Sequence, residues 1–171
     1  MPPAACWSPC GAWAGDGSVR ALPRRAGWGL LLAALLCSCT ITRHVQPVPP
    51  GTPLSPLCIE ENDAVWSKEF LPMLRDELAQ RGIATTVYRG SRPADCRYRL
   101  TYTANWYWDV AVYLKYADLR IYDGDALIGQ ATYDARDASA RMDKFGRTFS
   151  KIDPLLDELL RAAPAQLPPA R

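Results

Sequence analysis

The stretch CRYRLTYTANWYWD, residues 96–109, constrains the fold of this chain more than any other feature. Every second position is apolar, and the apolar set is Cys96, Tyr98, Leu100, Tyr102, Ala104, Trp106 and Trp108. The positions between them are mostly polar. A period of two over this length is typical of a β-strand in an antiparallel sheet, with one buried face and one face in water. We therefore expect a long strand here.

Periodicity elsewhere completes the predicted fold. A short strand at 57–60 precedes a helical stripe that repeats every four residues, Trp66, Phe70, Leu74 and Leu78. Alternation predicts a strand at 83–88, and Asp123-Gly124 suits a tight hairpin between two further strands. An apolar stripe in residues 151–163 predicts a closing helix. The order β-α-β-β-β-β-α predicts an α+β domain, an antiparallel sheet of about five strands with two helices on one face.

The N-terminal part carries an export signal. Arg20, Arg24 and Arg25 precede the apolar run from Ala26 to Leu36, and small residues follow it. The run is shorter than the roughly 20 residues that cross a bilayer, so a transmembrane anchor or a buried helix fits less well. A twin-arginine signal also fits less well, because Pro23 and Ala26 flank the arginine pair.

The end of this run resembles the bacterial lipoprotein signal. Leu36-Cys37-Ser38-Cys39 matches an aliphatic residue, two small residues and a cysteine. The resemblance implies cleavage before Cys39 and acyl chains such as palmitate on that residue, because stable anchoring needs more than one chain. Thr40 points to the outer membrane, on its periplasmic side. Residues 1–18 are unusual for a signal peptide, so we expect that Met1 is a misassigned start and Val19 the true one.

Composition limits the possible structure and function of residues 39–171. Residues 1–38 hold three basic residues and one acidic residue, so the remainder balances at 17 basic and 17 acidic residues. A neutral domain lacks the positive surface that binds nucleic acid, and we exclude that class. Residues 39–56 contain five prolines and read as a tether after the lipidated Cys39, long enough to span about 50 Å. We expect a globular domain at 57–162 and a disordered tail at 163–171.

Two cysteines remain in the predicted domain, Cys58 and Cys96. The compartment beyond the inner membrane is oxidising, so we predict that they form a disulfide; two buried free thiols are the alternative. By closing a loop in the unfolded chain, the bridge would stabilise the fold by about 3–4 kcal/mol. We predict no metal site, because the single histidine, His44, lies in the tether and the two cysteines lack zinc spacing.

The domain resembles a family of small uncharacterised lipoproteins from Gram-negative bacteria. The matching segments are CIEEN (58–62), VYRG (87–90), LTYTA (100–104), WD (108–109), YLKYADLRIY (113–122) and KIDPLLDELL (151–160). The resemblance supports the lipid anchor, the disulfide and the domain boundaries. It implies no catalytic residues.

The chemistry of the domain gathers in the aromatic segment around residues 102–116. Its rings could be core and cross-strand pairs, or a recognition surface, because Trp and Tyr make large rigid contacts. The candidate interaction surface is Asn105, Tyr107, Trp108, Asp109 and Tyr113. Acid pairs such as Glu60 with Glu61, Asp123 with Asp125 and Asp157 with Glu158 could suggest a carboxylate-dependent hydrolase. Strand-end, turn and solvated helix positions explain these pairs better.

The sequence therefore predicts a lipid-anchored envelope lipoprotein that binds an envelope protein partner, without enzymatic activity and without a cofactor. Binding of a glycan or small ligand at the aromatic hairpin is the alternative, and a hydrolase is a third possibility. The sequence leaves the partner and the oligomeric state open.

Overall fold

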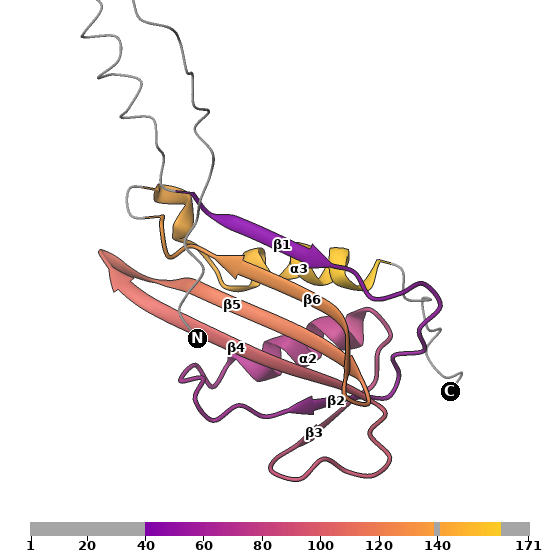
Figure 1. Ribbon diagram of the computed structural model, residues 1–171. Coiled ribbons are helices and arrows are strands. Elements are labelled where there is room, and N and C mark those ends of the chain that lie inside the picture. Colours follow the sequence, from indigo (N-terminus) through magenta and orange to yellow (C-terminus); the bar gives the residue numbers. More distant parts are fainter. Residues whose placement is uncertain (1–39, 139–140, 162–171) are drawn as a thin grey trace, which may run out of the picture. The chain divides into compact units, whose positions relative to one another are not determined.

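The computed structural model describes residues 40–138 and 141–161, and six strands of this part form one sheet (Figure 1). The expected signal peptide, Cys39 and the C-terminal tail lie outside the described residues. The strands are β1 (Thr42–Gln46), β2 (Leu57–Glu60), β3 (Thr85–Tyr88), β4 (Tyr98–Asp109), β5 (Ala111–Asp123) and β6 (Ala126–Asp134). The helices are α2 (Phe70–Gln80), α3 (Phe149–Leu160) and the short 3-10 helix η1 (Met142–Lys144). In this part no helix is both long and apolar enough to cross a membrane.

The two longest strands, β4 and β5, form the centre of the sheet as an antiparallel hairpin. The alternation of β4 buries Tyr98, Leu100, Tyr102 and Ala104, and the paired residues Ala117, Leu119 and Ile121 of β5 are also buried. These side chains face the two helices, which lie on the same side of the sheet (Figure 1). Apolar faces of the sheet and of both helices thus share one core.

The predicted antiparallel sheet of about five strands is wrong: the sheet has six strands in the order β1-β6-β5-β4-β2-β3 and is mixed. Strand β2 pairs in parallel with both β3 and β4. The physical reason is the connection through α2, because a helical crossover returns the chain to the end where β2 began. Strand β3 must therefore run in the same direction as β2.

The described part of the predicted tether is folded. Strand β1 lies at the edge of the sheet and pairs with β6, from Thr42 opposite Asp134 to Gln46 opposite Gln130. Val48 and Leu54 follow it and are each 1% exposed. The prolines of this segment thus separate side chains that the core buries, and the domain begins well before Leu57.

Helix α2 begins at Phe70, later than the apolar stripe suggests. Pro72 therefore falls in the first turn, where its missing N–H costs no helical hydrogen bond. Phe70, Leu74 and Leu78 are buried as predicted, but Trp66 precedes the helix and is 63% exposed. Only three members of the stripe belong to the core.

Candidate interaction surface

The face of the sheet opposite the two helices is polar, and the strand register shows which side chains share it. On β4, the residues between the buried ones are Arg99, Thr101, Thr103 and Asn105, and they pair with Tyr122, Arg120, Asp118 and Tyr116 of β5. Directly opposite residues of an antiparallel pair share a face. The same rows continue through Gln130, Thr132 and Asp134 on β6 to Gln46, His44 and Thr42 on β1.

At one end of this face, five side chains form what we call the Tyr107 surface: Asn105, Tyr107, Lys115, Tyr116 and Arg136. Together with Trp106 they line a shallow hollow. The Lys115 ammonium lies 4.2 Å from the centre of the Tyr107 ring, and the Arg136 guanidinium lies 4.8 Å from that of Tyr116. A cation over a ring face is attracted to it, so each contact favours the ring orientation seen here.

The Arg136 guanidinium is itself fixed by an ion pair. It contacts the Asp134 carboxylate at 2.5 Å, and this hydrogen bond lowers the pKa of Asp134. Burial raises the pKa of Tyr116, and the Asp118 charge adds to that effect. The surface thus combines two tyrosine side chains and Lys115 with one balanced ion pair.

A buried carboxylate lies beside this surface. Asp118 is 6% exposed, accepts hydrogen bonds from Gln130 and Thr132 at 2.8 Å, and pairs with Arg120 at 2.7 Å. Asp118 and Arg120 also line a second hollow, together with Tyr116 and residues 101–103. These contacts fix the middle of the polar face and leave no acid there unpaired.

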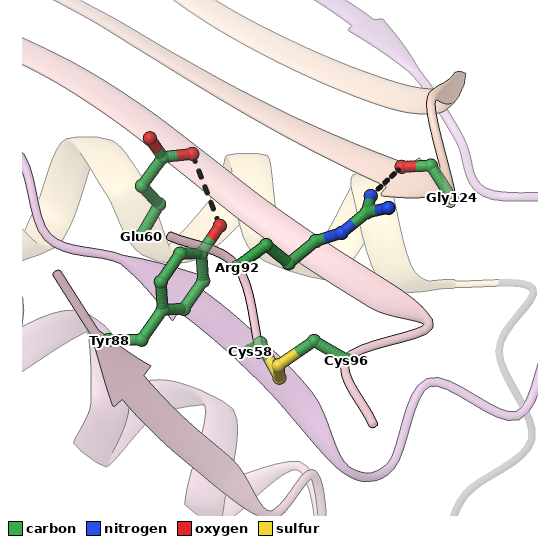
Figure 2. The surroundings of a disulfide bond; sticks show 6 residues. All are labelled: Cys58, Glu60, Tyr88, Arg92, Cys96 and Gly124. Atoms are coloured by element: carbon green, nitrogen blue, oxygen red, sulfur yellow. Dashed lines mark hydrogen bonds between the residues drawn. A yellow bond between two sulfur atoms is a disulfide. The ribbon is translucent and has the colours of Figure 1, made fainter. Parts of the chain in front are cut away.

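The predicted Cys58–Cys96 disulfide is present (Figure 2), and Cys58 on β2 lies opposite Arg99 of the polar face. Cys96 precedes β4, and the bridge packs with Tyr88 in a small cluster separate from the main core. The expectation that Cys96 shares the buried face of β4 is therefore wrong. The Tyr88 hydroxyl donates to Glu60, and Arg92 donates to the Gly124 carbonyl (Figure 2).

The structure divides the five residues of the predicted interaction surface. Asn105 and Tyr107 lie on the polar face, and Tyr107 is 53% exposed. Trp108 is exposed but alternates away from Tyr107. Asp109 pairs with the Lys144 ammonium at 2.5 Å. Tyr113 pairs directly with Tyr107 but is buried against Phe145, so it is not available to a partner.

Sequence reasoning missed Lys115 and Arg136, which complete the Tyr107 surface. Lys115 lies on β5 and Arg136 in the turn after β6, so only the folded sheet brings them to the same hollow as Tyr107. A β-bulge in β5 opposite the step from Asn105 to Trp106 places Lys115 there. The aromatic spacing of the sequence gives no signal for such a bulge, whereas a lysine between Tyr113 and Tyr116 could have drawn attention to Lys115.

The acid pairs considered for hydrolysis each contact an arginine. Arg99 binds Glu60, Arg89 binds Glu61 and Arg97 binds Asp123. Hydrogen bonds from these arginines lower the pKa of Glu61 and of Asp123, whereas a general acid needs a raised pKa. Among the described residues, no three His, Cys, Asp or Glu side chains gather as a metal site would require.

Comparisons with known proteins complete the description. No protein-family model matches the chain, and no curated protein matches it. Among solved structures, the chain is similar to a PelC variant dodecamer from Paraburkholderia phytofirmans, with 16% identity, a TM-score of 0.47, and coverage of 73% of this chain and 99% of that one. A second PelC dodecamer structure from that organism has 15% identity, a TM-score of 0.45 and coverage of 72% and 99%. Likenesses at this level carry no argument about function.

Proposed function

We propose that this protein is a lipoprotein of the bacterial envelope, anchored through acylated Cys39 on the periplasmic side of the outer membrane, and that it binds a protein partner through the Tyr107 surface. The support for the anchor is the lipoprotein signal at residues 36–39 and the resemblance to small lipoproteins. The support for partner binding comes from the polar face of the sheet.

One observation carries the proposal: the Tyr107 ring is exposed and yet contacts two neighbouring side chains that orient it. Neither of the two described α-helices covers this face of the sheet (Figure 1). Tyr107 is fixed by Lys115 and by an edge-on contact with the Tyr113 ring, whose centre lies 6.3 Å away. Exposed tyrosines held in one orientation bind a partner with little loss of conformational entropy, which is why interface hot spots are rich in Tyr and Arg.

The test is photocrosslinking in cells from a benzophenone amino acid at position 107. A matched control carries it at Gln80, an exposed position on helix α2. We expect a discrete protein adduct from position 107 and none from position 80, and we expect Lys115→Ala to reduce that adduct. Equal adducts from both positions would contradict the proposal. It would also be contradicted if unlabelled Tyr107→Ala protein reduced the adduct of the labelled protein as much as unlabelled wild-type protein does.

Glycan binding is the second candidate, and the hollow of the Tyr107 surface favours it. Two tyrosine rings and the Asn105 amide line this hollow, and rings with a neighbouring amide suit the apolar face and the hydroxyls of a sugar. Titration with envelope polysaccharide fragments distinguishes the two functions. Saturable binding that Tyr107→Ala abolishes, without a protein adduct in cells, would favour the glycan.

A further inference from the structure

The end of the β4–β5 hairpin carries exposed apolar side chains that the fold does not use. Trp108, Val110 and Val112 are 69%, 84% and 52% exposed, and we call them the hairpin tip. Trp108 and Val112 are directly paired, so they share one face, and Val110 forms the turn between the strands. Among the described residues, these are three of the eight exposed large apolar side chains; the others are Trp66, Tyr107, Leu127, Met142 and Phe149.

The turn residue is unusual in its backbone as well. Val110 has a φ of 64°, the left-handed region that a β-branched side chain adopts only with strain. Glycine or asparagine would relieve that strain, and the protein interior gains nothing from a valine that is mostly in water. A valine at this position therefore points to a requirement outside the folded domain.

The topology places this tip at the same end of the sheet as the start of the described chain. Thr42 pairs with Asp134, Asp134 with Tyr116, and Tyr116 with Asn105, so these residues form one row across four strands. Strand β1 starts at this row, and the β4–β5 hairpin extends beyond it (Figure 1).

We propose that the hairpin tip inserts into the membrane interface beside the acyl chains of Cys39; this inference rests on the proposed lipid anchor. Val110 lies five residues beyond Asn105, which is about 17 Å of strand. Cys39 lies three residues before Thr42 and can reach at most about 11 Å beyond the same row. The tip thus extends past the acylated residue by several ångströms, a depth typical of interfacial insertion.

The chemistry of the tip fits a phospholipid surface. Tryptophan is favoured at the boundary between head groups and acyl chains, because its ring is apolar and its N–H is polar. The acid nearest the tip, Asp109, is neutralised by its ion pair with Lys144, so it does not oppose approach to an apolar phase. Lys115 lies on β5 behind the tip, where an ammonium group can contact lipid phosphates.

A second copy of the chain fits the tip less well. A stable protein interface buries about 800 Å² on each partner, and three side chains at the end of a narrow hairpin supply far less. Nor does the tip form a concave surface: the hollow of the Tyr107 surface lies to one side of it. A fluid bilayer requires neither area nor shape complementarity.

The test uses the full chain in a Gram-negative host, with a benzophenone amino acid at position 110 or at position 112. Position 112 lies within regular strand and so covers the case in which the strained turn does not accept the label. The control position is Leu127, which is 40% exposed in the hairpin at the opposite end of the sheet. Each adduct is identified by mass spectrometry, and the same spectra give the acylation state of Cys39.

We expect at least tenfold more phospholipid adduct from positions 110 and 112 than from position 127. With Cys39 acylated, equal lipid adducts at all three positions overturn the inference alone, as does a protein adduct, including one with a second copy, at positions 110 and 112. An unacylated Cys39 overturns the anchor of the proposed function and this inference with it. If position 107 gives no protein adduct while position 110 gives lipid adducts, the proposed protein partner is contradicted and the membrane contact of the hairpin tip is supported.

Discussion

Gly129 of β6 tests whether the segment after β1 is packed as the structure has it. A Cβ atom at this position would lie 2.7 Å from Val48 Cγ2 and 3.1 Å from Leu159 Cδ1. Val48 is 1% exposed, and its N–H donates to the Leu159 carbonyl at 2.9 Å. The glycine therefore leaves room for a valine that we had placed in a free tether.

The size of the expected change in the free energy of unfolding follows from this geometry. Gly129→Ala forces a methyl group into a filled core, which costs about 2 kcal/mol of the free energy of unfolding. Val48→Ala removes two buried methyl groups, also at about 2 kcal/mol. In the double variant the Val48 methyl groups no longer obstruct the new Cβ, so we expect a total loss of about 2 rather than 4 kcal/mol. The coupling between the two sites is then about 2 kcal/mol.

Urea unfolding of the four proteins, followed by tryptophan fluorescence with the disulfide intact, measures this cycle. Two results would refute the reasoning. One is a double variant whose loss equals the sum of the single losses within about 0.5 kcal/mol, as expected for independent sites. The other is a Gly129→Ala protein as stable as the wild type. Either would mean that Val48 does not pack against β6 and that the tether is free.

Two further predictions concern charged side chains near the helices. Arg81 binds Glu77 at 2.8 Å and both Asp153 and Asp157 at 2.6 Å, joining α2 to α3. Arg81→Gln should cost about 2 kcal/mol of the free energy of unfolding, because the buried Glu77 loses its charged partner. A loss below about 0.5 kcal/mol in urea unfolding would contradict this. Burial lowers the pKa of Lys151 below its ordinary value near 10.5. Between the lowered pKa and 10.5 the unfolded chain binds a proton that the folded chain lacks, so the free energy of unfolding should rise with pH across that window. The Lys151→Met variant should lack this rise. The same pH slope in the variant and the wild type would contradict the prediction.

Strands with strong side-chain alternation were predicted from the sequence. Strand β1, whose pairing depends on residues distant in the sequence, was not. Strand β4 carries its own signal, because apolar residues alternate along it. Strand β1 carries none: four of its five residues are exposed, so nothing in TRHVQ distinguishes an edge strand from a linker. The prolines around it then favoured a tether, whereas the burial of Val48 and Leu54 depends on partners far along the chain.

The parallel pairing of β2 with β3 was open to prediction and was overlooked. A strand, a helix and a strand in succession indicate a parallel crossover, because the helix carries the chain back along the sheet. The pairing of β2 with β4 has no such local signal. Their sequences are separated by α2, β3 and a loop, and the residues opposite each other, from Leu57 with Tyr98 to Ile59 with Leu100, are set only by the assembled core.

The residues of the candidate surface were chosen from the sequence by residue type. The structure shows that their side chains do not all lie on the same face. Alternation along β4 already separates Tyr107 from Trp108, yet the prediction grouped them because both are aromatic. Tyr113 was grouped with them for the same reason, although Phe145 and the Lys144 ammonium cover its ring. Those two residues belong to the segment before α3, and no pattern within residues 105–113 indicates that this segment folds over the hairpin.

The correction to the tether also changes how the proposed function would operate. A free segment of residues 39–56 could hold the domain about 50 Å from the membrane, and the domain would sample many orientations. Because β1 starts at Thr42, at most about 11 Å of chain separates the domain from Cys39. With the proposed contact of the hairpin tip as a second attachment, rotation about the proposed anchor would be restricted as well. The Tyr107 surface would then be presented next to the bilayer, where restriction to the membrane raises the effective concentration of any partner embedded in it. The partner that this arrangement favours is therefore a protein of the same membrane rather than one free in the periplasm.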